Sequence, residues 1–558
     1  MGLLMSSSRT LWNRRIRVRD GIEIAADVIL PSESGPFPTV ALRTPYGRSR
    51  AIPRGTPFVD RGYAVVFVDV RGRGDSEGTW RPFVKDVNDA YDVVEWIAAQ
   101  SWSTGKIGMI GGSYEGLTQW WAAAGRPPHL SCIVPQAIGC VRESTVPHTG
   151  TGIPALYWLW WMTMVMGRTM QNGGSPSWED QILSLPLRGL DKRLGLTSSR
   201  WQSYIAGEME YLSADFALTH EQLAAIDVPV LIGVGWWDDQ TTLAAWHALQ
   251  NAKSASDCRL LVGAWDHAGN AVPRPVLGGL DVSRSLIDMP DYIEKFLAMH
   301  LKGETNEMTD APRCHVFQTG SYRWDDLEDW PPHDTTELSL YLASQGDARS
   351  LRGSGRLVRE PPNGAAVFDQ FTYDPNNPAR EMVDMAAFVW SDPPLDSRYT
   401  LRRQDVLVYD TAVMLEPLTI SGRVRFVLFV CSDREDTDLF TSIFDVEPDG
   451  RSIALGAAIP LEGALRLSHR EGLHAKPLRP GNIVEIHING VWLHHVVMCG
   501  HRLRVAISSS RFPFYSRNAG TCEFWADATT LVPQTNTLYH SAVYPSRVLL
   551  PIIVEKPS

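Results

Sequence analysis

The apolar pattern of this 558-residue chain changes character once, close to Pro331. Before that point, short runs of Val, Ile and Leu alternate with segments whose apolar residues recur at helical spacing. After it, apolar and polar residues alternate with a period of two between turns rich in Pro, Gly and Asp. The first pattern predicts a mostly parallel sheet covered by helices, and the second predicts an antiparallel β-sandwich.

The α/β pattern is itself interrupted. Between about Arg142 and Asp227 the chain is rich in Trp, Met and Leu and shows no strand pattern, which indicates an inserted helical cap. Strands are predicted over 37–46, 62–70, 106–113, 227–239 and 259–269, and helices over 86–100, 114–125, 241–252 and 288–303. The predicted domains are 1–141 and 228–330 for the two parts of the α/β domain, 142–227 for the cap, and 331–558 for the β-sandwich.

The composition of the chain excludes several classes of partner. The chain is 44% hydrophobic with a formal net charge of −11, which argues against nucleic acid as a partner because phosphate binding needs a basic face. No run approaches the roughly 20 apolar residues of a membrane span, and residues 1–20 lack the pattern of a signal peptide. The seven cysteines form no CxxC pair, which predicts neither a disulfide framework nor a zinc site and favours a cytoplasmic location. No His/Cys/Asp cluster has metal-ligand spacing, so no metal is required, and no cofactor is expected.

One hexapeptide points to chemistry. In Gly111-Gly112-Ser113-Tyr114-Glu115-Gly116, a serine lies between a predicted strand and a predicted helix. Such a sharp turn lifts the hydroxyl above the sheet edge, and glycines supply the room that the turn needs. The strict G-x-S-x-G pattern is absent because Glu115 holds its last position. Alone, the hexapeptide fits either a catalytic serine or an ordinary turn.

Candidates for a base and its carboxylate follow in the order typical of α/β-hydrolases. Asp238 follows one predicted strand and His267 follows the next, each on a loop. A nucleophilic serine needs such a histidine, and the histidine needs a carboxylate to orient it. Asp238 and Asp239 could instead cap the helix that begins near Thr241, a role that suits Asp239 by itself. Asp266 is a weaker candidate, because side chains of adjacent residues on an extended chain point to opposite faces.

These segments together resemble a known family. The motifs GGSYEG, GWWDD, GAWDH, RTPYGR and DVRGRGDSEG, and later FTYDPNNP and GHRLRVAISSSRFPFYSRN, are similar to those of the cocaine esterase and X-Pro dipeptidyl-peptidase group of serine hydrolases. The resemblance implies an α/β-hydrolase fold with a cap, a C-terminal jelly-roll (galactose-binding-like) β-sandwich, and a homodimer.

The resemblance also implies site residues. The nucleophile falls on Ser113, the triad acid on Asp238 and the base on His267. The oxyanion hole falls on the hydroxyl of Tyr46 and the backbone N–H of Tyr114, and two such donors suit a tetrahedral intermediate.

The 20 tryptophans of the chain give an indication of its substrate. An aromatic cap segment, 154–170, and a Trp pair beside Asp238 predict a pocket for a bulky apolar or aromatic acyl group. The tentative substrate-binding residues are Trp158, Trp161, Trp237 and Gln240. Cocaine esterases carry an aromatic residue where Gln240 stands, so acyl specificity is expected to differ.

The leading hypothesis is hydrolysis of a small-molecule carboxylic ester through an acyl-enzyme. One alternative is an amidase or acylase with the same triad. Another is an α-amino-acid ester hydrolase, in which Glu115 and Asp239 would hold the substrate ammonium. X-Pro dipeptidase action is less favoured, because those peptidases carry an extra N-terminal helical domain that is not expected here. A binding protein whose jelly roll captures carbohydrate is a further alternative.

Overall fold

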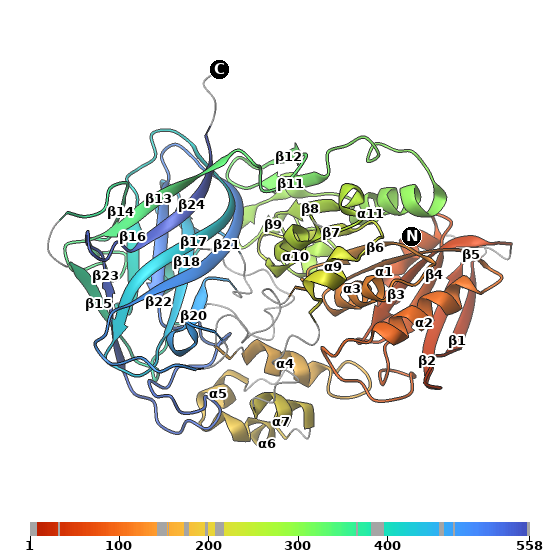
Figure 1. Cartoon of the computed structure of the whole chain (residues 1–558), viewed down its shortest axis with the longest axis horizontal. Coiled ribbons are helices and arrows are strands. Elements are labelled where there is room, and N and C mark those ends of the chain that lie inside the picture. The colour runs from red at the N-terminus through yellow and green to blue at the C-terminus, as the bar shows by residue number, and fades with distance from the viewer. Residues whose placement is uncertain are drawn as a thin grey trace.

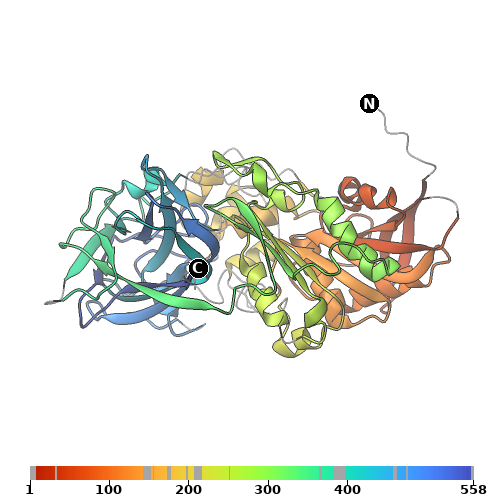
Figure 2. The same cartoon turned by 90° about the horizontal axis from the view of Figure 1, so that it is seen from above.

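The computed structural model places two bodies side by side, an α/β domain and a β-sandwich, with short helices below their junction (Figure 1). From above, the two bodies form an elongated molecule (Figure 2). The structure describes residues 8–31, 34–141, 153–154, 156–171, 178–195, 199–206, 217–250, 252–363, 367–380, 396–456, 462–472 and 475–554.

Ten strands of the described chain form the sheet of the α/β domain. In spatial order they are β1 (Arg9–Arg17), β2 (Glu23–Leu30), β4 (Ala64–Asp69), β3 (Phe37–Thr44), β5 (Ser103–Gly112), β6 (Leu130–Gln136), β7 (Leu231–Gly235), β8 (Arg259–Gly263), β11 (Cys314–Gln318) and β12 (Arg323–Leu327). Neighbours from β4 to β11 are parallel, whereas β1, β2 and β12 pair antiparallel at the edges.

Helices bury both faces of this sheet. On one face lie α1 (Arg48–Val59) and α11 (Met289–Leu297), and on the other lie α2 (Val87–Ala98), α3 (Tyr114–Gly125) and α10 (Thr241–Leu249). Strand β4 shows the alternation, because Val65 and Phe67 pack toward α1 while Val66 and Val68 pack into the opposite core. Burial on both faces explains why the central strands read as continuous apolar runs.

Several elements of this domain were not predicted, among them strands β1, β2, β6, β11 and β12 and helix α1. Strands β1 and β2 and helix α1 lie in segments without a clear apolar period, and α1 contains Pro53 and Pro57, residues that normally end a helix. Helix α1 forms because its buried residues Ala51, Phe58 and Val59 pack against the sheet. Tertiary packing therefore outweighs the local propensity here.

The described part of the cap consists of short helices: α4 (Leu156–Met164), α5 (Trp178–Leu183), α6 (Leu190–Arg193), α7 (Ser199–Ile205) and α9 (His220–Ala224). Seven of the nine residues of α4 are buried, so its aromatic side chains are covered nearly all round. The cap is fastened to the β-sandwich, since the Leu156 N–H donates to Phe514 O at 2.7 Å and Arg188 pairs with Asp527. The predicted cap start at 142 lies outside the described residues.

The C-terminal half is a β-sandwich whose neighbouring strands are antiparallel except for β14 and β16. Its described strands are β13 (Thr335–Ala343), β14 (Arg356–Val358), β15 (Phe368–Tyr373), β16 (Val406–Asp410), β17 (Leu418–Ser432), β18 (Asp438–Val446), β19 (Ser452–Ala454), β20 (Ala464–Arg466), β21 (Val484–Val497), β22 (Arg502–Ser508), β23 (Gln534–Tyr539) and β24 (Arg547–Ile553). The buried cluster that covers α2, α3 and α10 extends from the α/β domain into this half through Trp330, Trp492 and Tyr515, beside the sandwich's own core. The two halves of the molecule therefore share one buried cluster. None of the described helices is both long and apolar enough to cross a membrane.

Candidate active site

The predicted catalytic residues follow four strands of the parallel sheet. Tyr46 follows β3, Ser113 follows β5, Asp238 follows β7 and His267 follows β8. Because parallel strands end at the same edge of a sheet, these loops meet along one edge, where ligands bind in open α/β sheets. Strands β3 and β5 are direct neighbours, which brings Tyr46 next to Ser113.

Ser113 lies on a strained turn between β5 and α3. Its φ of 60° and ψ of −133° are unusual for a residue with a side chain. A Cβ on Gly111 would lie 2.7 Å from Cβ of Glu115, and one on Gly116 would lie 2.8 Å from Ile138. Both glycines are therefore needed for the close packing of strand and helix. The turn also leaves the N–H of Tyr114, the first residue of α3, without an acceptor inside the helix.

His267 is held by a buried carboxylate. Its Nδ1 lies 2.7 Å from Oδ1 of Asp238, whose side chain is completely buried. The other oxygen of Asp238 accepts a hydrogen bond of 2.6 Å from Nδ2 of Asn270. The carboxylate is thus bound on both oxygens, and Nδ1–H of His267 donates to it, which leaves Nε2 as the proton acceptor.

The same carboxylate sets the protonation of the imidazole. Burial disfavours the charged form of His267, but the attraction and hydrogen bond of Asp238 outweigh it and raise the pKa of His267 above its ordinary value of 6.5. Asp239 and Asp266 add smaller contributions in the same direction. An imidazolium formed at this position is therefore stabilised.

The two neighbouring aspartates have other contacts. Asp239 accepts from the backbone N–H of Thr241 at 3.0 Å and from its hydroxyl, at the start of α10. Burial raises the pKa of Asp239 to about 7. Asp266 accepts from the Gly269 N–H at 2.9 Å and pairs with Arg274. Asp238 alone of these three carboxylates hydrogen-bonds His267 in the described structure.

Tyr46 and Ser113 line the same cavity. The Tyr46 hydroxyl accepts a hydrogen bond of 3.3 Å from Nε1 of Trp161, and the Ser113 side chain lies close enough to influence the pKa of Tyr46. Burial raises the pKa of Tyr46, so the hydroxyl keeps its proton and can donate a hydrogen bond to an anion. This position suits one donor of an oxyanion hole.

A cavity of about 780 Å³ opens above Ser113, His267 and Tyr46. Helices α1, α4 and α11 each contribute apolar side chains to its wall, and α1 also contributes the charged side chains Arg50 and Arg54. The apolar lining includes Trp160, Trp161, Met164, Met170, Met289 and Ile293. A cavity of this size and lining suits a small molecule with an apolar part.

Of the four tentative substrate-binding residues, Trp161 lines this cavity and the other three do not. Trp158 packs on Phe83, with ring centroids 4.8 Å apart. Trp237 donates to Ala454 O at 3.0 Å, and the Gln240 side chain exchanges hydrogen bonds with the backbone of Trp492. Trp237 and Gln240 therefore face the β-sandwich, a direction that the sequence does not reveal.

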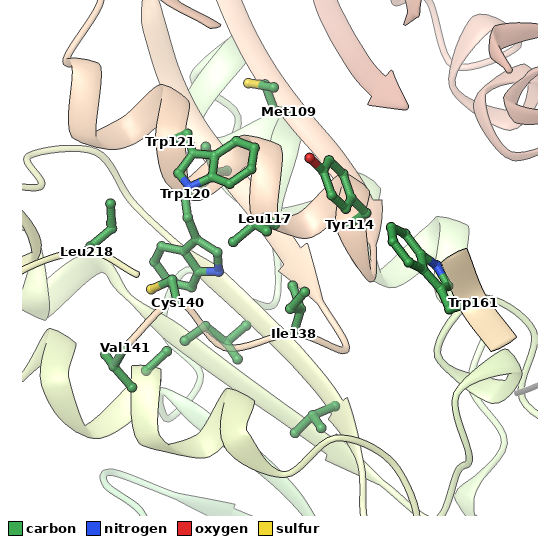
Figure 3. Close-up of a cluster of buried hydrophobic side chains, with 14 of the residues drawn as sticks. Met109, Tyr114, Leu117, Trp120, Trp121, Ile138, Cys140, Val141, Trp161 and Leu218 are labelled. Carbon is green, nitrogen blue, oxygen red and sulfur yellow. The ribbon is translucent and has the colours of Figure 1, made fainter. Parts of the chain in front are cut away.

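The tryptophan clusters likewise separate by role. Figure 3 shows Trp120 and Trp121 on α3, with Trp161 across from Tyr114. The Tyr114 ring lies between two of them, 6.1 Å from Trp161 and 5.8 Å from Trp121. Trp120 and Trp121 are completely buried, so they belong to the core behind the nucleophile, whereas Trp160 and Trp161 reach the cavity.

Two further contacts of the site were missed from the sequence. Arg54 donates two hydrogen bonds, of 2.5 and 2.6 Å, to the completely buried Glu115. Asn270 holds Asp238 as described above. The first depends on the unpredicted helix α1, and the second has no local sequence signal beyond its place three residues after His267.

The comparisons with known proteins agree along the whole chain. The profile of the X-Pro dipeptidyl-peptidase (S15) family matches residues 20–269, and that of the X-Pro dipeptidyl-peptidase C-terminal non-catalytic domain matches residues 306–549. The chain is 31% identical over 577 residues to the cocaine esterase of Rhodococcus sp. (strain MB1 Bresler), covering 97% of this chain and 98% of that protein.

Two solved structures share the fold over 99% of this chain and 98% of theirs. One is an α-amino acid ester hydrolase, with a TM-score of 0.86 and 24% identity, and the other is an aminopeptidase from a marine sediment archaeon of the Thaumarchaeota, with a TM-score of 0.84 and 23% identity. The α/β-hydrolase fold with a C-terminal β-sandwich is thereby confirmed. The identity to cocaine esterase over nearly the full length of both proteins shows that this chain belongs to the X-Pro dipeptidyl-peptidase (S15) family of hydrolases.

Proposed function

We propose that this protein is a serine hydrolase that cleaves carboxylic esters, with Ser113 as nucleophile, His267 as general base and Asp238 as its carboxylate partner. One observation carries the proposal: Ser113, Tyr46 and His267 line one cavity, where His267 is hydrogen-bonded to the buried Asp238. Its relative named cocaine esterase supports an ester as the substrate.

In the proposed reaction, Oγ of Ser113 forms a bond to the acyl carbon while its proton passes to Nε2 of His267. The Tyr46 hydroxyl and the Tyr114 N–H donate to the oxyanion. The bond to the alcohol oxygen then breaks, and His267 returns the proton to that oxygen. Water repeats the sequence on the acyl-enzyme, releasing the acid and restoring Ser113.

We further propose an acyl group that is bulky and apolar or aromatic. The support is the cavity wall formed by the cap and α11, which includes Trp160, Trp161, Met164 and Met289. Aromatic and thioether side chains pack adaptably around such groups.

Hydrolysis of an amide needs the same triad and is the second candidate. The α-amino-acid ester alternative needs acidic side chains free to bind an ammonium group. The contacts favour a substrate without one, because Glu115 is engaged by Arg54 and Asp239 by Thr241. Rates on matched ester, anilide and α-aminoacyl ester substrates separate these candidates.

The decisive test is Ser113→Ala with a fluorophosphonate probe and a p-nitrophenyl ester. We expect loss of labelling and of turnover, with an unchanged circular dichroism spectrum. Ser101→Ala, at an exposed serine, is the matched control and should keep both. Labelling that survives in Ser113→Ala would place the nucleophile elsewhere, and no labelling of the wild-type chain would favour the carbohydrate-binding alternative.

The oxyanion donor is tested separately. Tyr46→Phe removes the hydroxyl and should lower kcat by about 10²–10³-fold. Tyr399→Phe, at a side chain that is 62% exposed, should leave kcat unchanged. The homodimer and the cytoplasmic location stay predictions, and sedimentation velocity tests the first.

A further inference from the structure

Helix α1 presents one face to the cavity. Arg50, Pro53, Arg54 and Pro57 all line it, and their spacing of three and four residues places them on one side of a helix. Two guanidinium groups one turn apart therefore border the chamber that holds Ser113. Like charges at this spacing repel each other, so each needs a compensating anion or solvent.

Arg54 already has its anion inside the protein. Both guanidinium nitrogens NH1 and NH2 donate to Glu115, whose side chain is completely buried while that of Arg54 is 39% exposed. The carboxylate lies behind the cavity wall, and the guanidinium lies at its surface. The charges of this pair cancel. Glu115, the acidic residue closest in sequence to Ser113, is therefore already bound by Arg54.

Arg50 has no such partner in the part of the chain that the structure describes. Within the described residues it forms no ion pair, and its NH1 donates to the sulfur of Met170 at 3.1 Å. A thioether is a weak acceptor that carries no charge, so this contact does not neutralise the guanidinium of the exposed Arg50 and leaves most of its donors to solvent or to another group. Met170 lines the same cavity, which keeps Arg50 at the cavity wall.

The rest of the described lining carries no opposing charge. Its ionisable side chains are Tyr46, Arg50, Arg54 and His267, and no Asp or Glu of the described chain is among the lining residues. Among the described lining residues, Arg50 is thus the one cation without a compensating anion, although the protein as a whole has a formal net charge of −11. A cation in this position selects among substrates by charge.

We infer that the substrates of this site are esters that also carry a carboxylate, bound by the guanidinium of Arg50. A planar guanidinium binds a carboxylate through two parallel charge-assisted hydrogen bonds, which a neutral substrate cannot form. The inference rests on the proposed esterase function and names its substrate class. It extends the apolar-acyl proposal, since the apolar wall would hold the chain between the ester and the carboxylate.

The test compares two p-nitrophenyl esters of equal acyl length, the monoester of glutaric acid and the ester of pentanoic acid. The wild-type chain should have the higher kcat/KM on the glutarate ester, mainly through a lower KM. Arg50→Gln should lower the ratio of the two kcat/KM values by about tenfold, the loss that one charged contact implies. Arg50→Lys, which keeps the charge but not the planar fork, should give an intermediate ratio.

Arg61→Gln is the matched control, because Arg61 lies just beyond α1 and does not line the cavity. It should keep the wild-type ratio. A wild-type preference for the pentanoate ester, or a ratio that Arg50→Gln leaves unchanged, would overturn the inference. The esterase proposal fails separately, since it requires only that wild-type protein hydrolyse either ester and that Ser113→Ala hydrolyse neither.

Discussion

Nδ2 of Asn270 donates a 2.6 Å hydrogen bond to Oδ2 of Asp238, the carboxylate oxygen that His267 does not use. The same amide donates to the backbone oxygen of Asp266 at 2.9 Å, which ties the carboxylate to the histidine loop. A carboxylate held at both oxygens cannot rotate away from the imidazole. We therefore treat Asn270 as a positioning residue of the candidate triad.

Removing this amide should slow catalysis without abolishing it. A hydrogen bond to a charged group contributes about 1.5–3 kcal/mol, so Asn270→Ala should lower kcat by about tenfold or more. Losing a donor to the carboxylate should also raise the pKa of His267, moving the acid limb of the kcat/KM profile to higher pH. Asn306→Ala, in a remote loop where its amide donates to Lys295 O, should change neither quantity. An unshifted limb in Asn270→Ala would mean that Asn270 serves only loop stability.

The wild-type pH profile follows from the state of His267. The base must be neutral, so kcat/KM should fall as pH falls through the pKa of His267. Because Asp238 raises that pKa, the midpoint of the acid limb should lie above 6.5. Asp238→Asn should move the midpoint to lower pH and cut kcat by about 10⁴-fold. A midpoint at or below 6.5 in the wild type would contradict the assigned pair.

The Arg54–Glu115 pair should contribute to stability. Arg54→Ala leaves a buried carboxylate without its cation, which costs about 3 kcal/mol, the low end for a buried pair because Arg54 is partly exposed. Arg126→Ala breaks a pair exposed on both sides and should cost less than about 1 kcal/mol. Urea unfolding of both variants measures the difference. Adding Glu115→Gln to Arg54→Ala should recover part of the loss, and equal losses in the two single variants would contradict this account.

Substitutions of Trp160 and Trp237 should have different effects, one on substrate preference and the other on stability. Trp160→Leu enlarges the cavity and should shift the acyl-chain preference toward longer esters. Trp237→Leu removes a hydrogen bond to Ala454 O and packing against the sandwich, so it should lower Tm and leave the acyl preference unchanged. A panel of p-nitrophenyl esters from acetate to decanoate measures the preference, and thermal unfolding measures Tm. A shifted preference in Trp237→Leu would return that residue to the substrate site.

Local pattern was sufficient where an element is long and regular. The helix predicted over 114–125 is α3, Tyr114–Gly125, and the strands on either side of the cap appear as β5, β7 and β8. Helix α1 was missed because its segment lacks a clear apolar period and contains two prolines, which normally end a helix. The sequence placed Asp238 in a loop after a strand, as in the structure, but it did not show that the Trp237 side chain faces the β-sandwich.

The sequence by itself determined the order of the candidate loops, and therefore their place at one sheet edge, because parallel strands separated by helices must all end there. Only the tertiary structure decided which side chains meet at that edge. Asn270 reaches Asp238 across 32 residues and Arg54 reaches Glu115 across 61. Such contacts depend on how separate helices and loops pack on the sheet, and no local spacing encodes that packing. The charge of the cavity follows from those contacts, so it too became visible only in three dimensions.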